Sequence, residues 1–216
     1  MLKRRFIHLF HVLSGREFLQ RNTYNSNQFW KRALVIVPWY ILGVFYAVLD
    51  LLFFGYLFQG IMSVTQRNGR KLSPEELSLF SNLSQELGYL KTVRVYEKSW
   101  VARTGAWMTR RKSLGLGLGN TIHFSREIDL ENTADLRWFV HEMAHTLQFK
   151  YRGLIYIPEA LIAQQFSGYS FGGLKTLRQI TKLRAFNPEQ QAEVFAAVQL
   201  SYFETDIRKD IENGNW

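Results

Sequence analysis

The sequence predicts an α+β domain preceded by an apolar helical segment that inserts into a membrane. Three observations support this fold class. Residues 33–64 form an apolar run with one charged residue. Residues 92–97 and 120–125 are short and rich in β-branched and aromatic side chains, as the strands of a small sheet are. Residues 132–147 and 187–203 carry apolar residues at helical spacing, which predicts a long helix followed by C-terminal helices.

The composition limits the size of the domain and the chemistry of any metal site. The 216 residues suffice for one ordinary domain with an appendage. The chain is 47% hydrophobic, so most of it should fold. There are no cysteines, which excludes disulfides, iron–sulfur clusters and cysteine-ligated zinc. A metal would therefore need histidine, aspartate or glutamate ligands.

The positive charge of the chain is placed as it is around membrane segments. The formal net charge is +9, and many of the basic residues flank the apolar run. They are Lys3, Arg4, Arg5, Arg16, Arg21, Lys31 and Arg32 before the run, and Arg67, Arg70 and Lys71 after it. No basic groove with interleaved aromatic residues is evident, so we expect no nucleic-acid partner.

The apolar run 33–64 is expected to be the contact with a membrane. As one helix it would be about 48 Å long, too long for one upright span of a ~30 Å bilayer core and too short for two. One span that is tilted or kinked at Pro38, with an interfacial extension, fits this length best. The alternative is a buried helical hairpin of a soluble protein, because Asp50 lies in the middle of the run.

These patterns divide the chain into four parts. Before the run, basic and apolar residues alternate at helical spacing, and His8 and His11 fit that amphipathic pattern without a metal role. The glycine, proline and charged residues that follow the run are typical of a linker. The parts are 1–32, a basic amphipathic segment; 33–64, the hydrophobic membrane segment; 65–71, the linker; and 72–216, the folded domain.

The folded domain begins with a helix. Ser73 is a good N-cap, Pro74 fits the first helical position, and two glutamates follow in the first turn. We expect this helix to end at Gly88. The strands predicted next are separated by a polar and glycine-rich stretch. Its segment 115–120, GLGLGN, lacks the strand, helix and Lys-Ser/Thr context of a phosphate-binding loop, so a flexible approach to a strand is the better interpretation.

The long helix carries the motif HEMAH. It begins near Asn132 or Thr133, both good N-caps. His141 and His145 are four residues apart, so their imidazoles project from one face and can occupy two corners of a tetrahedral zinc site. Glu142, between them, is placed to act as general base on a zinc-activated water. A chain of this composition would contain about 0.007 chance matches to H-E-x-x-H.

A catalytic zinc site needs a third protein ligand, and a carboxylate must supply it because no third histidine follows the motif. The segment 186–200 is the best place to look. Asn187 caps a helix there, and Glu189 and Glu193 lie four residues apart on a face expected to be buried. Either glutamate can be the ligand. Glu159 is a weaker third candidate, because it can simply cap its own helix.

The stretch from about residue 93 to residue 197 resembles the zinc-peptidase domain of the extracellular contractile injection system core family and of Vgr-related proteins. Four segments carry the likeness: VRVYEKSWVA, LGNTIHFS, VHEMAHTLQFKYRG and FNPEQQAEVF. The apolar run and its basic flanks are not part of it. The resemblance implies a zincin-like fold of the gluzincin type, in which the HEMAH helix lies behind a strand lining the substrate cleft. That strand is formed by Asn120, Thr121, Ile122, His123 and Phe124.

The resemblance also concerns the outer parts of the site. It implies that Glu189 completes the metal site, while the register of the acidic position leaves Glu193 as an alternative. Gln148 matches a glutamine that often follows the second histidine, outside the ligand set.

Stabilisation of the transition state requires a hydrogen-bond donor to the oxyanion. Candidates are Tyr151, Tyr156, His123 and nearby arginines.

We therefore expect a membrane-anchored zinc metallopeptidase that hydrolyses a peptide or protein substrate, located in a bacterial inner membrane with the side of its domain undecided. One alternative is a catalytically silent zinc-fold scaffold or secretion-system module, although the retained Glu142 argues against it. Another is a membrane-binding or pore-associated protein in which HEMAH is only structural. The sequence leaves the substrate, the oxyanion donor and the oligomeric state open.

Overall fold

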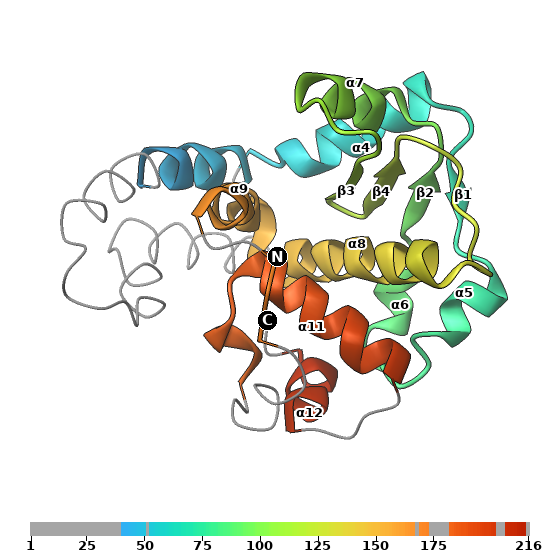
Figure 1. Ribbon diagram of the computed structural model, residues 1–216. Coiled ribbons are helices and arrows are strands. Elements are labelled where there is room, and N and C mark those ends of the chain that lie inside the picture. Colours follow the sequence, from blue (N-terminus) through green and yellow to red (C-terminus); the bar gives the residue numbers. More distant parts are fainter. Residues whose placement is uncertain (1–39, 51, 167–168, 173–181, 202–205, 215–216) are drawn as a thin grey trace.

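The chain folds around a small mixed sheet with helices on both faces, as a computed structural model shows (Figure 1). The structure describes residues 40–50, 52–166, 169–172, 182–201 and 206–214. The predicted α+β class is thus confirmed. The basic amphipathic segment 1–32, with His8 and His11, lies outside the described residues, as does Pro38.

The described elements follow one another in a largely helical order. Residues 40–50 are helical. The elements after them are α4 (Phe54–Thr65), β1 (Arg70–Lys71), α5 (Pro74–Ser78), α6 (Leu87–Leu90), β2 (Arg94–Tyr96), α7 (Trp100–Met108), β3 (Gly115–Leu118), β4 (Thr121–Phe124), α8 (Thr133–Arg152), the 3₁₀ turn η2 (Gly153–Ile155), α9 (Tyr156–Phe166), the 3₁₀ turn η3 (Leu183–Ala185), α11 (Pro188–Ser201) and α12 (Asp206–Glu212).

The sheet has the strand order β1-β2-β4-β3. β2 and β4 are parallel, and the two outer strands run antiparallel to their neighbours. β4 is buried throughout, and its side chains alternate between the two faces. Ile122 and Phe124 enter the core cluster that α8 completes, whereas His123 lies against Phe58 of α4. The sheet is therefore covered by α8 on one face and by α4 and α7 on the other (Figure 1).

α8 is the central helix, and its predicted start is confirmed. The side chain of Asn132 accepts hydrogen bonds from the backbone N–H groups of Ala134 and Asp135, and the helix ends at Arg152, followed by Gly153 as its C-cap with a positive φ of 64°. The predicted apolar stripe of α8 is buried against the sheet and α11, which runs alongside α8 (Figure 1). This packing brings the first turn of α11 beside the HEMAH motif.

The first predicted helix is shorter than expected. Ser73 and Glu76 form a capping box, as the sequence indicated, but α5 ends at Ser78 and a second short helix, α6, follows. Between them the chain turns so that Phe80 and Leu83 are fully buried, and Phe80 stacks on Phe195 of α11. Burial of the side chains of Phe80 and Leu83 outweighs continuation of the helix through a segment that is rich in serine and asparagine.

The apolar run is not one continuous helix. Its described part consists of the helix 40–50 and α4, separated at Phe53, which has a left-handed φ of 59°. Asp50, the one charged residue of the run, is buried against Gly153 at the end of α8. Within the described ranges, none of the helices has both the length and the apolar character needed to cross a membrane.

The expected linker 65–71 is also structured. Arg70 and Lys71 form β1 and pair with β2. Gln66 at the end of α4 donates a hydrogen bond to Ser99, the N-cap residue of α7, at 3.1 Å. α7 itself lies in the stretch between the two predicted strands that is polar and glycine-rich in sequence, and for which no helix was predicted.

Candidate metal centre

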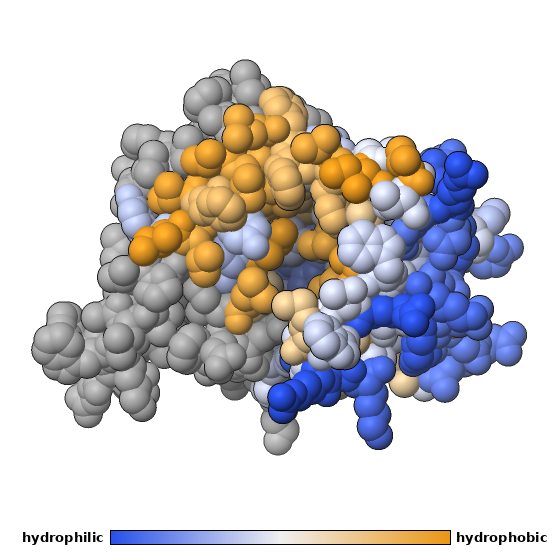
Figure 2. Space-filling view, turned by 90° about the horizontal axis from the view of Figure 1, so that it is seen from above, coloured by the Kyte–Doolittle hydropathy of each residue, from blue (hydrophilic) through white to orange (hydrophobic). Residues whose placement is uncertain are grey.

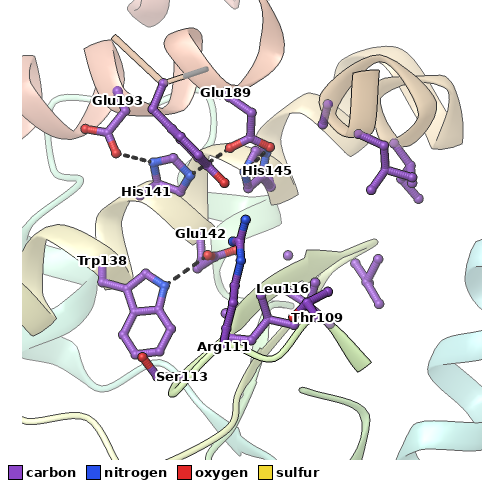
Figure 3. A pocket seen from close by; sticks show the side chains of 18 of the residues that line it. Thr109, Arg111, Ser113, Leu116, Trp138, His141, Glu142, His145, Glu189 and Glu193 are labelled. Atoms are coloured by element: carbon purple, nitrogen blue, oxygen red, sulfur yellow. Dashed lines mark hydrogen bonds and ion pairs between the residues drawn. The ribbon is translucent and has the colours of Figure 1, made fainter. Parts of the chain in front are cut away.

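His141 and His145 of α8 and Glu189 of α11 form one buried group (Figure 3). Each offers a ligand atom, and the three atoms lie within 4.8 Å of one another. The Nε2 atom of His141 is 3.4 Å from one carboxylate oxygen of Glu189, and that of His145 is 3.7 Å from the other. Two donor atoms bound to one ion at about 2.0–2.1 Å and tetrahedral angles are roughly 3.3 Å apart. The group could therefore hold a metal ion.

The local sequence explains why Glu189 reaches this position. Asn187 caps α11, accepting a hydrogen bond from the backbone N–H of Gln190 at 2.9 Å, and Pro188 occupies the first helical position. Glu189 thus stands in the first turn of α11, where it is 2% exposed. A carboxylate this deeply buried requires a cationic partner or hydrogen bonds.

The other ring nitrogen of each histidine also faces a polar side chain, through an ion-pair contact at His141 and a hydrogen bond at His145. Nδ1 of His141 lies 3.0 Å from Oε1 of Glu193, one turn further along α11 (Figure 3). Nδ1 of His145 lies 2.8 Å from Oε1 of Gln148. Gln148 donates through Nε2 to the carbonyl of Pro188 at 2.8 Å, so its oxygen faces the imidazole and accepts the Nδ1 proton. The lone pair on Nε2 of His145 is then directed at the ligand group.

The structure therefore separates the two candidate glutamates. Glu189 contacts both Nε2 atoms, whereas Glu193 contacts Nδ1 of His141 and the guanidinium of Arg137. Glu159 is part of neither arrangement, because it forms a buried ion pair with Arg152.

The electrostatics of the group favour a positive charge among the three ligands. Burial lowers the pKa of His141, but the carboxylates of Glu189 and Glu193 outweigh this and raise it to about 10. The pKa of His145 is also raised, by Glu189 against the effect of burial. Burial raises the pKa of Glu189, yet the two histidines lower it overall. Protons on the imidazoles or a divalent cation can supply the charge.

Glu142 is buried beside the group but does not belong to it. The indole Nε1 of Trp138 donates a hydrogen bond to its Oε1 at 3.2 Å (Figure 3). Burial raises the pKa of Glu142, although the nearby histidines and this hydrogen bond oppose the rise. A carboxylate of raised basicity suits a group that must take up a proton and release it again.

A cavity of about 470 Å³ opens onto these residues. Its walls come from β3, α8, α9, α11 and the loop that follows α7. The strand in its wall is β3, not the expected segment 120–124. β4 lies one strand further into the sheet and is covered on both faces, so none of its residues lines the cavity.

β3 is glycine-rich because it packs directly on the HEMAH helix. A Cβ at Gly115 would lie 2.5 Å from Oε1 of Glu142, and a Cβ at Gly117 would lie 2.6 Å from Cβ of His145. Side chains at these positions would push the strand off α8. This contact explains the GLGL sequence in physical terms and replaces the expected flexible approach with a packed edge strand.

The candidate oxyanion donors lie in different environments. Tyr156 lines the cavity, stacks against His145 and donates its hydroxyl hydrogen to the carbonyl of Gly117. Burial raises its pKa well above the usual value, so it stays a donor at neutral pH. Tyr151 instead donates to the buried Glu86, and His123 lies on the far face of the sheet.

His123 has a structural role. Its Nδ1 is 2.9 Å from Oγ of Ser99, which accepts from Gln66, and its Nε2 is 2.9 Å from Oγ1 of Thr121, which donates to the carbonyl of Leu118. These directions assign the imidazole proton of His123 to Nε2, and every donor in this series of hydrogen bonds then has an acceptor. The ring is neutral, because burial lowers its pKa to about 4.

Two further residues at the cavity were not singled out from the sequence. Trp138 is one turn before Glu142, at the spacing of helical neighbours, but its indole also fits an apolar stripe. Arg111 follows α7 and extends toward the group, near Glu142 (Figure 3). It also lies near Tyr169, another cavity residue far away in the sequence, and opposes the rise that burial causes in the pKa of that phenol.

No protein-family model, no curated protein and no solved structure matches the chain.

Proposed function

We propose that the chain is a zinc-dependent peptidase in which His141, His145 and Glu189 hold the ion and Glu142 is the general base. The observation that carries this proposal is the convergence of three buried ligand atoms from two helices at one cavity, with the carboxylate of Glu142, whose pKa is raised, beside them. The zincin-like fold inferred from the four resembling segments belongs to the same proposal.

Zinc fits the donor set best. Two imidazole nitrogens and one carboxylate oxygen, without cysteine, form a ligand set typical of catalytic zinc sites. Three protein ligands leave the fourth tetrahedral position for water or substrate. The Nδ1 contacts with Glu193 and Gln148 resemble the outer hydrogen bonds that orient metal-binding histidines.

The residues around the group support hydrolysis of a peptide bond. When bound, zinc supplies Lewis-acid activation of water and of the scissile carbonyl. Glu142 accepts a proton from the attacking water as the water oxygen bonds to the carbonyl carbon. It then returns the proton to the amine nitrogen as the C–N bond breaks. β3 forms the cavity wall and one edge of the sheet, where an extended substrate backbone can lie.

Metal analysis and hydrolysis of an unstructured protein such as casein, both on the full chain, test the proposal together. Wild type should contain about one zinc per chain and cleave the protein. Glu142→Gln should keep the zinc and lose cleavage by at least about a hundredfold, because only the proton acceptor is removed. His145→Ala should lose both.

The outcomes also separate this proposal from a scaffold role. Zinc in wild type without hydrolysis would favour a catalytically silent zinc-fold module. Full hydrolysis by Glu142→Gln would exclude the mechanism, and absence of zinc after its addition would exclude the metal site.

A further inference from the structure

One side of the molecule carries an exposed apolar face. Figure 2 looks onto this side and shows apolar side chains gathered there. They belong to the helix 40–50, the turn that follows it, α4 and α7. Exposed side chains include Ile41 at 62%, Leu52 at 69%, Leu57 at 59% and Val64 at 75%. A contiguous apolar surface of this kind marks an interaction site in a folded protein.

α4 is apolar on its outward side as well as on its inward side. Met62 is buried, whereas Leu57, Ile61 and Val64 are exposed at spacings of four and three residues. The hydroxyls of Ser63 and Thr65 donate to backbone carbonyls within the helix. A helix without charge on its outer face, whose hydroxyls are satisfied internally, is suited to an apolar environment.

α7 adds tryptophan and positive charge to this side. Trp100, Arg103 and Trp107 lie at spacings of three and four residues, so they share one face of the helix, and Ala102 and Ala106 are buried on the other. Trp100 is 52% exposed and Trp107 is 79% exposed. Exposed tryptophan next to arginine on a helix is typical of segments that lie in a lipid headgroup layer.

The loop after α7 adds further positive charge to that of Arg103 at the edge of the apolar face. Arg110 and Lys112 are exposed there, on either side of Arg111, which extends into the cavity (Figure 3). Each cation near an anionic membrane surface contributes about 1 kcal/mol of attraction. An apolar face bordered by cations matches an anionic bilayer in both properties, whereas another protein surface would have to supply an acidic rim around an apolar patch.

The cavity opens at the border of this face. Leu161 of α9, 53% exposed, is both a cavity residue and an exposed apolar side chain. Thr109 and Arg111, one and three residues after the exposed Met108 at the end of α7, also line the cavity.

We propose that the face formed by helix 40–50, α4 and α7 binds the surface of an anionic lipid bilayer, with α7 in the headgroup layer. α7 lies outside the apolar run and reaches the face only through folding, so this surface differs from a simple N-terminal anchor. Taken with the proposed peptidase activity, on which this last step rests, the substrate class is a polypeptide segment at the bilayer surface.

Flotation of the full chain with vesicles tests the docking. The vesicles are phosphatidylcholine alone or phosphatidylcholine with phosphatidylglycerol. The double variant Trp100→Glu/Trp107→Glu changes the charge by the same amount as Lys209→Glu, which alters an exposed residue of α12 on the opposite side of the molecule (Figure 1). We expect the double variant to bind anionic vesicles at least about tenfold more weakly, and Lys209→Glu to stay within about twofold of wild type.

The comparison between variants is decisive, because the basic segment 1–32 can itself attract vesicles. Both tryptophans are on the surface, so the double variant should fold, and circular dichroism checks this. If the double variant does not fold, the single variant Trp107→Glu replaces it in the comparison. Glu142→Gln should bind vesicles like wild type, which separates docking from catalysis. Equal binding by the double variant and Lys209→Glu would overturn the proposal. So would a concentration-dependent dimer that the tryptophan changes abolish without affecting vesicle binding.

Discussion

Nδ1 of His141 lies 3.0 Å from Oε1 of Glu193, while Nε2 of the same ring faces Glu189 at 3.4 Å. The two glutamates are one helical turn apart on α11 and act on opposite nitrogens of one imidazole. Removing one or the other should therefore affect zinc binding differently.

Glu189→Ala should abolish stoichiometric zinc binding, because it removes a ligand. Glu193→Ala should keep zinc at saturation but weaken its affinity by roughly 10–100-fold, because it removes only the partner that orients His141. Competition with a chelator of known affinity measures both variants. Loss of zinc in Glu193→Ala with retention in Glu189→Ala would reverse the assignment.

Gly117→Ala should destabilise the fold and impair the site. The added Cβ would meet Cβ of His145 at 2.6 Å and the backbone carbonyl of Glu142 at 2.7 Å, and neither can move without shifting α8. We expect a loss of about 1–3 kcal/mol in the free energy of unfolding. Gly88→Ala is the matched control, since a Cβ there meets nothing within 4 Å. Urea denaturation compares the two, and equal stability of both variants would argue against close packing of β3 on α8.

The stability of the chain should fall on acidification through the titration of His123. Its pKa of about 4 in the folded chain is below the unfolded value of ~6.5, so between these values the unfolded state binds more protons. The titration of His123 by itself therefore lowers the free energy of unfolding by about 2 kcal/mol between pH 7 and pH 5. Urea unfolding of the chelator-treated chain at both pH values measures this. In His123→Gln the difference should shrink by that amount, and an unchanged difference would contradict the buried neutral imidazole.

Tyr156→Phe should cost stability more than it costs catalysis. The phenol hydrogen is given to the carbonyl of Gly117, so its removal leaves a buried acceptor unpaired and should lower the free energy of unfolding by about 1–3 kcal/mol. We expect zinc to be retained and kcat to fall less than about tenfold. A fall of a hundredfold or more would instead identify the hydroxyl as an oxyanion donor. Steady-state kinetics with a peptide found to be cleaved by wild type decides between them.

Local sequence signals predicted the parts of the fold that depend on neighbouring residues. The caps at Ser73, Asn132 and Asn187 mark helix starts that the structure confirms, because capping is decided by side chains within three positions of the helix end. The pairing of His141 and His145 on one face also follows from helical spacing alone.

What depends on packing was visible only in the tertiary structure. Glu189 and Glu193 are equivalent by spacing, and only the approach of α11 to α8 directs them to different nitrogens of His141. By itself, the glycine-rich sequence of β3 indicated a flexible approach to a strand. Its glycines are required by the close packing of β3 on α8, whose contacting residues lie 25 to 30 positions further along the chain, beyond the range of any local sequence pattern.

The apolar run shows the same division. Its composition by itself indicated a preference for an apolar environment. The position of Asp50 against Gly153, the break at Phe53 and the placement of α7 beside α4 arise from contacts between residues far apart in the sequence. The sequence thus indicated the capped helix starts, the apolar segments and the residues that can bind a metal, but neither α7 nor the break between α5 and α6. The tertiary structure alone decided which side chains meet, because contact free energies depend on the relative placement of whole elements.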